Sequence, residues 1–502
     1  MLAGTGSDVG KSVLATALCR ILLQDGYRPV PFKAQNMALN SYATPDGYEI
    51  GRAQAVQAEA CRLAPHTDMN PLLLKPSSDH TSQVVLHGKP IGNRNAYDFW
   101  GGGGEALDFR HEVCSAFDRL ATHYNPVVME GAGSISEMNL RDHDLVNLPM
   151  ARHAGAAVIL VVDIDRGGVF ASCYGSIKLQ SPEDQRLIRG IIVNKFRGDL
   201  RLFDDGRRLL EQYCGVPVLG VIPYVNDLHI DAEDSVVLER RGERTANNVR
   251  PTSVDHNKPQ ASGLKPQTQI AVLLLHHLSN FTDFNVLERD PRVNLFYTKE
   301  PADLTQADII IIPGTKATLD DLYHLRRSGL ASAILQAHAD GKTVMGICGG
   351  FQMLGRTISD PDGIEGNIDE MPGLGLLDMR TVMTQEKTTR QVEFTFHGHR
   401  CRGYEIHQGR STATDPIVTN GHTIGTYIHG CLDNRPVIDW LLSTTSPASG
   451  RVAGIHAGIT VNTSPLPEEI DADRQHQYDL LADHVRHHLD MAKLYTILRD
   501  HP

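Results

Sequence analysis

A glycine-rich stretch near the start of the chain has the residue types of a phosphate-binding loop. Residues 4–12 read GTGSDVGKS. In such loops, backbone N–H groups at the start of a helix bind phosphate, the lysine balances its charge and the hydroxyl binds magnesium. Five residues, instead of the usual four, separate Gly4 from the GKS unit. A helical apolar stripe follows, as the motif requires. The candidate nucleotide-binding residues are Gly4, Thr5, Gly10, Lys11 and Ser12.

A second glycine-flanked turn carries a candidate nucleophile. Cys348 lies in the stretch GICGG, after an apolar strand pattern and before a helix start. At such an elbow the thiol faces substrate, the next N–H can stabilise an oxyanion, and the helix N-terminus lowers the pKa of the thiol. The alternative is a small buried hydrophobic cysteine, but the flanking glycines favour the nucleophile. For the base that a nucleophilic cysteine needs, His429 in GTYIHG is favoured and His407 in YEIH is second.

Composition excludes several classes of protein. Lys and Arg total 48 against 60 Asp and Glu, a net charge of −12, so the broad basic surface of a nucleic-acid-binding protein is not expected. The longest apolar run, residues 154–162, is about half the roughly 20 residues of a membrane span, and no signal-peptide pattern is present. The eight cysteines are scattered without a CxxC pair, which fits reduced thiols. A cytoplasmic enzyme is predicted, with no oligomeric state implied.

Two α/β domains are needed to position these motifs. Short β-branched runs alternate with helical patterns in the first half, which predicts a doubly wound parallel sheet. Only Met1-Leu2-Ala3 precede the phosphate loop, so we expect either a very short first strand or a natural start further upstream. Strand patterns resume after a polar stretch, and Leu481, Val485 and Leu489 predict a packing helix. The expected divisions are a nucleotide domain at 1–238, a linker at 239–269, a second α/β domain at 270–450 and a helical extension at 451–502.

The combination of motifs resembles the glutamine-hydrolysing adenosylcobyric acid synthase family of cobalamin biosynthesis. The resemblance covers nearly the whole chain. Besides the phosphate loop, it rests on PFKAQNMALNS (31–41), EIGRAQAVQAEA (49–60), MNPLLLKP (69–76), MEGAGS (129–134), VVDIDRGGVFAS (161–172), IIVNKFRGD (191–199), SNFTDF (279–284), IIPGTKAT (311–318), GICGGFQMLG (346–355), YEIHQG (404–409) and GTYIHG (425–430).

The resemblance implies a fold and an activity. It implies an α/β, P-loop synthetase domain like dethiobiotin synthetase, with a doubly wound sheet, followed by a class I glutamine amidotransferase domain. The implied reaction amidates the b, d, e and g carboxylates of adenosylcobyrinic acid a,c-diamide, with ATP, Mg²⁺ and glutamine as nitrogen source. The chemistry agrees, because a carboxylate must be activated, here as an acyl phosphate, before ammonia can displace its oxygen.

In the synthetase domain, the resemblance implies roles for several residues. Ser12 and Glu130 are the expected magnesium-associated pair, with a helix-capping role the alternative for Glu130. Lys33 matches a phosphate-facing lysine, and Asn194 and Lys195 resemble an adenine-reading pair.

Further polar residues are weaker candidates. Asp163 and Asp165 end a strand and are expected at the same site without an assigned role. Candidates for holding the other substrate carboxylates, with ordinary surface charge as the alternative, are Arg166, Lys75 and Arg197.

In the second domain, the resemblance implies that Cys348 forms a γ-glutamyl thioester, with His429 carrying protons. Gly314 and Gly349 are the expected oxyanion donors. Many class I amidotransferases carry Glu two positions after the histidine, but that position is Cys431 here. The third triad member stays open, with Asp433 or Glu405 as candidates if the fold brings them near.

Two other functions compete with this interpretation. The related cobyrinic acid a,c-diamide synthase shares both domains, but the FKAQNMALNS and DIDRGG stretches favour the enzyme that forms four amides. A partitioning-type P-loop ATPase switch would explain the phosphate loop, yet it would leave Cys348 and His429 without a role.

Overall fold

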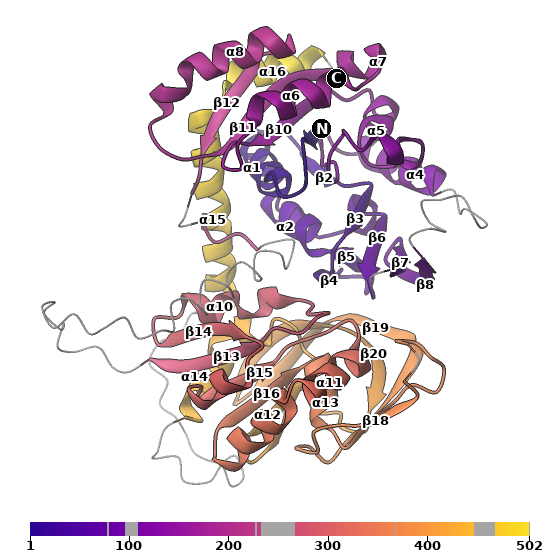
Figure 1. Ribbon diagram of the computed structural model, residues 1–502, viewed down its shortest axis with the longest axis vertical. Coiled ribbons are helices and arrows are strands. Elements are labelled where there is room, and N and C mark those ends of the chain that lie inside the picture. Colours follow the sequence, from indigo (N-terminus) through magenta and orange to yellow (C-terminus); the bar gives the residue numbers. More distant parts are fainter. Residues whose placement is uncertain are drawn as a thin grey trace, which may run out of the picture.

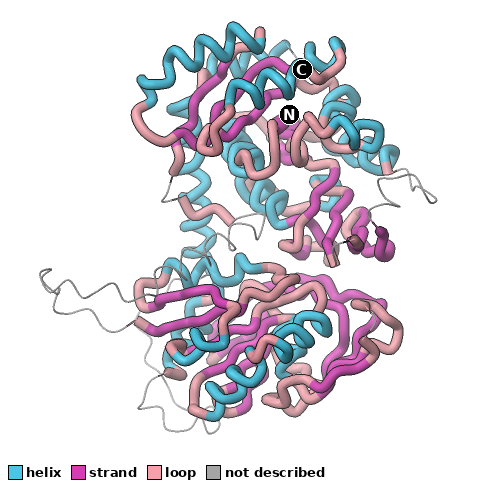
Figure 2. Tube along the Cα trace, in the orientation of Figure 1, coloured by secondary structure: helices cyan, strands magenta, loops and turns pink. Residues whose placement is uncertain are grey.

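The chain forms two α/β domains that lie one above the other, with both chain ends in the upper, N-terminal domain (Figure 1). The computed structural model describes residues 1–77, 80–95, 109–225, 228–231, 267–366, 368–445 and 467–500. Strands lie between helices in both domains (Figure 2), so the predicted fold class is confirmed. Most of the expected linker, and residues 451–466 of the expected extension, fall outside the described residues.

The main sheet of the N-terminal domain is parallel. Its order is β1-β10-β11-β12, and a bridge between Leu2 and Glu130 joins the β2–β9 pair to β1. The short first strand is buried and paired on both sides, and helices cover both faces, which explains the continuous apolar runs. The strands are β1 (Leu2–Gly4), β2 (Val30–Phe32), β9 (Val127–Met129), β10 (Val158–Asp163), β11 (Ile188–Phe196) and β12 (Val218–Pro223).

An arm of short strands extends from this domain toward the other one (Figure 1). It was not predicted, because its strands are only three to seven residues long. It consists of a hairpin, β4 (Ser41–Ala43) and β5 (Glu49–Gly51), and a sheet of β3 (Gln35–Met37), β6 (Leu72–Pro76), β7 (Thr81–Leu86) and β8 (Lys89–Asn95). The helices of the domain up to residue 214 are α1 (Lys11–Gln24), α2 (Arg52–Ala60), η1 (Thr67–Met69), α4 (Arg110–Ala121), η2 (Met138–His143), α5 (Leu148–His153), α6 (Val169–Lys178), α7 (Pro182–Leu187), η3 (Leu200–Phe203) and α8 (Asp204–Cys214).

The C-terminal domain has a six-stranded sheet in the order β14-β13-β15-β16-β22-β21, parallel except for β21. A second sheet, β18-β17-β19-β20, contains a long hairpin. The strands are β13 (Thr268–Leu273), β14 (Val293–Thr298), β15 (Ile309–Ile312), β16 (Thr343–Ile347), β17 (Thr357–Ser359), β18 (Glu370–Pro372), β19 (Arg380–Phe396), β20 (His399–Ser411), β21 (Val418–Asn420) and β22 (Thr423–Thr426). The helices are η4 (Phe281–Phe284), α10 (Asn285–Arg289), η5 (Pro301–Thr305), α11 (Thr318–Arg327), α12 (Leu330–Ala339), α13 (Gly349–Leu354), η6 (Cys431–Asp433) and α14 (Arg435–Ser443).

The last two helices, α15 (Pro467–His488) and α16 (Met491–Asp500), return to the N-terminal domain (Figure 1). The predicted packing stripe on α15 is buried in one core with α1. Arg20 of α1, which is 1% exposed, donates to Asp479 (2.7 Å) and Gln475 (2.8 Å). The C-terminal segment therefore completes the core around the phosphate-loop helix.

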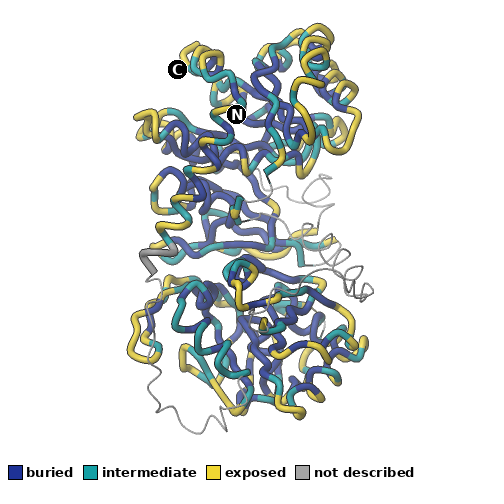
Figure 3. The backbone as a smooth tube through the Cα atoms, turned by 90° about the vertical axis from the view of Figure 1, so that its left-hand side faces the viewer, coloured by how far each residue is buried: buried dark blue, intermediate teal, exposed yellow. Residues whose placement is uncertain are grey.

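Buried backbone runs through the centre of each domain (Figure 3). Among the described helices, none combines the length and the apolar character that crossing a membrane requires.

Candidate active sites

The phosphate loop folds around Lys11. Gly10 has φ 95°, a left-handed conformation that glycine adopts without strain, and α1 begins at the next residue. The Lys11 ammonium donates to the carbonyl oxygens of Gly6 and Gly133, each at 2.9 Å. A Cβ atom at Gly4 would lie 2.7 Å from the Lys11 nitrogen, so the loop requires glycine there. The arrangement places a cation and a helix N-terminus at one point, which suits an anion.

Glu130 joins the loop to three other elements. This carboxylate, 1% exposed at the end of β9, accepts from Ser12 Oγ (2.8 Å), Lys33 Nζ (2.8 Å) and Gln57 Nε2 (2.6 Å). Its partners come from α1, from the segment after β2 and from α2, so it is not simply a helix cap. A hydroxyl and a carboxylate side by side are oxygen donors of the kind that Mg²⁺ prefers. The residues present therefore fit the expected metal.

Asn194 and Lys195 lie behind the phosphate loop. Asn194 Nδ2 donates to Val9 O (2.9 Å), and Lys195 Nζ donates to the carbonyl of Asp8 and lies 3.1 Å from Asp163 Oδ2. Asp163 Oδ1 accepts from the backbone N–H of Asp165 (2.8 Å). The two residues predicted to read adenine therefore contact the phosphate loop from the carboxyl end of β11.

Two of the weaker candidates lie at the rim of this loop. Arg166 pairs with Asp8 (2.8 Å) and Arg197 pairs with Asp165 (3.0 Å), and about half of each arginine side chain is exposed. Both are therefore accessible from the nucleotide side of the domain.

Lys75, a candidate for holding a substrate carboxylate, is not the ordinary surface charge that was the alternative. Lys75 is buried and donates to Glu49 (2.6 Å) and to Ser41 Oγ (2.8 Å). Glu49 also pairs with Lys387 of the C-terminal domain (2.5 Å). Burial acts against the charge of Glu49, but Lys387 and Lys75 hold the pKa of its carboxyl well below the usual range. Lys75 therefore belongs to an ion cluster between the domains.

Cys348 lies at a strained turn between β16 and α13. Its φ and ψ are 54° and −110°, a conformation that non-glycine residues adopt only where the surroundings enforce it. A Cβ atom at Gly350 would collide with the carbonyl oxygen of Ile312, which explains a glycine on the helix side. Cys348 is 6% exposed, and its Sγ lies 3.5 Å from Ile406 O. The strand–turn–helix context predicted for a nucleophile is present.

His429 follows β22, the strand next to β16, and is paired with a carboxylate that the sequence interpretation missed. Its Nδ1 lies 2.7 Å from Asp283 Oδ2, and Asp283 Oδ1 accepts from the backbone N–H of Gly430 (2.9 Å). Burial lowers the pKa of the imidazole, but Asp283 and the neighbouring Cys348 outweigh it and raise that pKa to about 10. The structure thus brings Cys348, His429 and Asp283 together.

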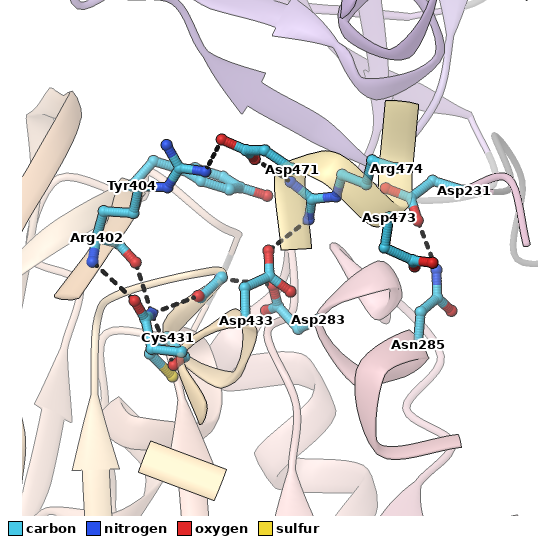
Figure 4. A network of polar contacts seen from close by, with 12 residues as sticks. Asp231, Asp283, Asn285, Arg402, Tyr404, Cys431, Asp433, Asp471, Asp473 and Arg474 are labelled. Atoms are coloured by element: carbon cyan, nitrogen blue, oxygen red, sulfur yellow. Dashed lines mark hydrogen bonds and ion pairs between the residues drawn. The ribbon is translucent and has the colours of Figure 1, made fainter. Parts of the chain in front are cut away.

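The two residues considered for the third position have other partners. Asp433 forms an ion pair with Arg474 of α15 (Figure 4), and Glu405 pairs with Arg390 (2.7 Å). Asp283 was within the SNFTDF stretch, shortly after β13. The signal that could have found it is that the carboxyl ends of parallel strands meet at one edge of a sheet.

The remaining predicted glutaminase residues surround the same pocket. His407 stacks on Tyr427 with ring centroids 3.8 Å apart and lines the pocket, but Asp283 does not bond to it. Gly349 also lines the pocket. A Cβ atom at Gly314 would lie 3.1 Å from His429 Cε1, so this turn approaches the imidazole closely.

The pocket is built from both domains. Ser41 and Lys75 come from the N-terminal domain, and Lys316, Lys387 and Glu365 come from the C-terminal domain. Burial lowers the pKa of Lys316 and lowers that of Lys387 to about 7, while it raises the pKa of Glu365 to about 7. Cations and a carboxylate around a thiol suit a substrate that carries both a carboxylate and an ammonium group.

Comparison with known proteins defines the class first. Residues 1–237 match the CobQ/CobB/MinD/ParA nucleotide binding domain, and residues 269–437 match the CobB/CobQ-like glutamine amidotransferase domain. The protein is a glutamine amidotransferase ligase in which one chain carries both sites.

Full-length relatives define the family. The chain is 57% identical over 518 residues to the cobyric acid synthase of Bacteroides fragilis, covering 100% of this chain and 98% of that protein. It is 56% identical to the enzyme of that name from Phocaeicola vulgatus (99% and 98% covered) and 42% identical to that of Salmonella heidelberg (100% and 98% covered). The chain belongs to the cobyric acid synthase family.

Proposed function

We propose that this chain amidates the b, d, e and g carboxylates of adenosylcobyrinic acid a,c-diamide, using ATP and glutamine. The observation that carries the proposal is the presence of two chemically different sites in one chain. One is the Cys348–His429–Asp283 arrangement, and the other is the phosphate loop with Glu130 and Lys33. The full-length relatives named cobyric acid synthase favour the enzyme that forms four amides over the a,c-diamide synthase. A switch ATPase leaves the cysteine site without a role.

The glutaminase half-reaction follows from the contacts of Cys348. The thiolate attacks the glutamine amide carbon, a C–S bond forms, and the C–N bond then breaks as His429 gives its proton to the leaving nitrogen, which departs as ammonia. Water then hydrolyses the thioester to glutamate and restores the thiol. Asp283 keeps the imidazole oriented through its 2.7 Å hydrogen bond. The N–H groups of Gly314 and Gly349 are the proposed donors to the oxyanion.

The synthetase half-reaction follows from the phosphate loop. A substrate carboxylate oxygen attacks the γ-phosphorus of ATP, ADP leaves, and the acyl phosphate forms. Ammonia then attacks the acyl carbon, a C–N bond forms, inorganic phosphate departs with the C–O bond electrons, and the nitrogen loses one proton. Lys11 and the loop N–H groups would hold the phosphates, and Lys33 would balance the charge of the acyl phosphate. Mg²⁺ held by Ser12 and Glu130 would neutralise the phosphate oxygens as ADP leaves.

Mass spectrometry of adenosylcobyrinic acid a,c-diamide, incubated with the protein, ATP, Mg²⁺ and glutamine, tests the proposal. With the wild type and glutamine, four successive replacements of OH by NH₂ are expected. The Cys348→Ala variant should make the same four replacements when ammonium is supplied instead of glutamine. With glutamine, Cys348→Ala should form no amide, because the thioester cannot form. If the wild type hydrolyses ATP but leaves the corrin substrate unchanged, the partitioning-type ATPase switch is favoured. If only two amides form, an enzyme that amidates a different set of carboxylates is favoured.

A further inference from the structure

Two glutamines of α2 have buried amide atoms that no group in the described part of the chain satisfies. Gln54 and Gln57 are both 0% exposed. Within the part of the chain that the structure describes, Gln54 Nε2 and Gln57 Oε1 have no hydrogen-bond partner. Leaving such a buried group unpaired is energetically costly, so buried polar atoms in native proteins nearly always have a partner.

The other amide atom of each glutamine is bonded, which fixes the orientation of both. Gln54 Oε1 accepts from Asn36 Nδ2 (3.0 Å), and Gln57 Nε2 donates to the carboxylate of Glu130 (2.6 Å). Residues three apart lie on the same face of a helix. The donor and the acceptor therefore belong to residues one helical turn apart on α2. A small neutral molecule with a lone pair and an N–H or O–H bond satisfies both, whereas an ammonium ion has no lone pair to accept with.

One end of this pair touches the synthetase site. Gln57 bonds to Glu130, which in turn accepts from Ser12 and Lys33. A molecule held between the two glutamines is therefore next to the place where the acyl phosphate forms.

The other end of the pair lies close to the β4–β5 hairpin, which borders the glutaminase pocket. A Cβ atom at Gly51 would lie 2.8 Å from Gln54 Oε1 and 2.9 Å from Asn36 Nδ2. Gly51 is paired across the β4–β5 hairpin with Ser41. Ser41 lines the pocket of Cys348, and its N–H donates to Asn280 of the C-terminal domain (3.0 Å). Gln54 is therefore close to Gly51, whose strand partner Ser41 borders the pocket of Cys348.

We propose that Gln54 and Gln57 bind ammonia, in its neutral form, on its way from Cys348 to the acyl phosphate. The inference rests on the proposed function. The nitrogen lone pair accepts from Gln54 Nε2, and an N–H donates to Gln57 Oε1. Because neither contact supplies a charge, the site favours ammonia over ammonium and keeps the nucleophile reactive. Water shares this hydrogen-bonding chemistry and is the competing occupant.

Kinetics with ammonium chloride in place of glutamine separate the two occupants. Gln54→Met keeps the length and helix preference of the side chain and removes its amide. We expect the KM for ammonia to rise about tenfold, while the KM for ATP stays unchanged. With glutamine, more glutamine should be hydrolysed per amide formed. Gln54→Glu, which keeps an acceptor for Asn36 but loses the donor, is the second variant if the methionine variant does not fold, and the same rise is expected.

The matched control is Gln180→Met. Gln180 is buried in the same domain, but its Nε2 donates to Ile135 O (2.8 Å) and Ser176 O (3.0 Å), so its loss should leave the KM for ammonia unchanged. An unchanged KM for ammonia and an unchanged ratio of glutamine hydrolysed to amide formed in the Gln54 variants would overturn the proposal and assign the site to water. Failure of the wild type to use ammonium would contradict the proposed function instead.

Discussion

The phosphate site and the glutaminase site share a strand–turn–helix backbone, but their key side chains have different partners. In each, a buried strand ends at a turn that requires glycine, and a helix begins directly afterwards. Lys11 donates to the backbone carbonyl oxygens of Gly6 and Gly133. His429 is held by the carboxylate of Asp283.

This difference separates a site organised for an anion from one organised for proton transfer. At the first site, the charge of Lys11 lies at the N-terminus of α1, where a phosphate group can bind. The charged partner of His429 raises the pKa of the imidazole to about 10 before any substrate is bound. Activity at the first site should therefore depend on the lysine charge, and activity at the second on the carboxylate.

The largest effect is expected from Lys11→Ala. Loss of the charge that binds the phosphates should lower amide synthesis at least about 1,000-fold, with glutamine or ammonium alike. Product formation from both nitrogen sources is the measurement, and Lys178→Ala, an exposed lysine at the end of α6, is the control. Near-normal synthesis with ammonium would show that ATP is bound elsewhere.

Asp283→Asn should lower the glutaminase kcat about 100-fold, because the imidazole loses its charged partner. Asp283 raises the pKa of His429, so its loss lowers that pKa and moves the high-pH limb of kcat/KM to lower pH. Ammonium-dependent synthesis should stay within about twofold, which separates this change from general unfolding. Asp433→Asn is the control, since Asp433 pairs with Arg474 instead. A wild-type pH profile for Asp283→Asn would contradict the role given to this carboxylate.

A smaller effect is expected between the two sites, at Glu49. Glu49→Gln removes the negative charge that Lys75 and Lys387 share and should cost about 2 kcal/mol of stability at neutral pH. The folded-state pKa of Glu49 is depressed, so its contribution is present above the ordinary carboxyl pKa and is lost as pH falls below it. Urea unfolding at several pH values should show this acid dependence in the wild type and less of it in Glu49→Gln. Equal dependence in both would assign acid sensitivity to other groups.

The sequence revealed what is local and missed what depends on tertiary contact. The phosphate loop and the Cys348 elbow are continuous stretches whose glycines, nucleophile and lysine are recognisable at fixed spacing. The partner of His429 lies 146 positions away, and only the adjacency of strand ends brings it near. The partners of Lys75 could not be predicted, because nothing in its own neighbourhood shows that β6 and the β4–β5 hairpin carry it toward the C-terminal domain. Short strands and a core completed by α15 are likewise set by packing.

The transfer of ammonia between the two sites is tested most directly by following the nitrogen atom of glutamine. Wild-type protein is incubated with ATP, Mg²⁺, adenosylcobyrinic acid a,c-diamide and [amide-¹⁵N]glutamine, with unlabelled ammonium in the solution, and the product is analysed by mass spectrometry. Four new amides that carry ¹⁵N are expected, because ammonia passes from Cys348 to the acyl phosphate inside the protein. Amides whose nitrogen reflects the unlabelled ammonium in solution would contradict it.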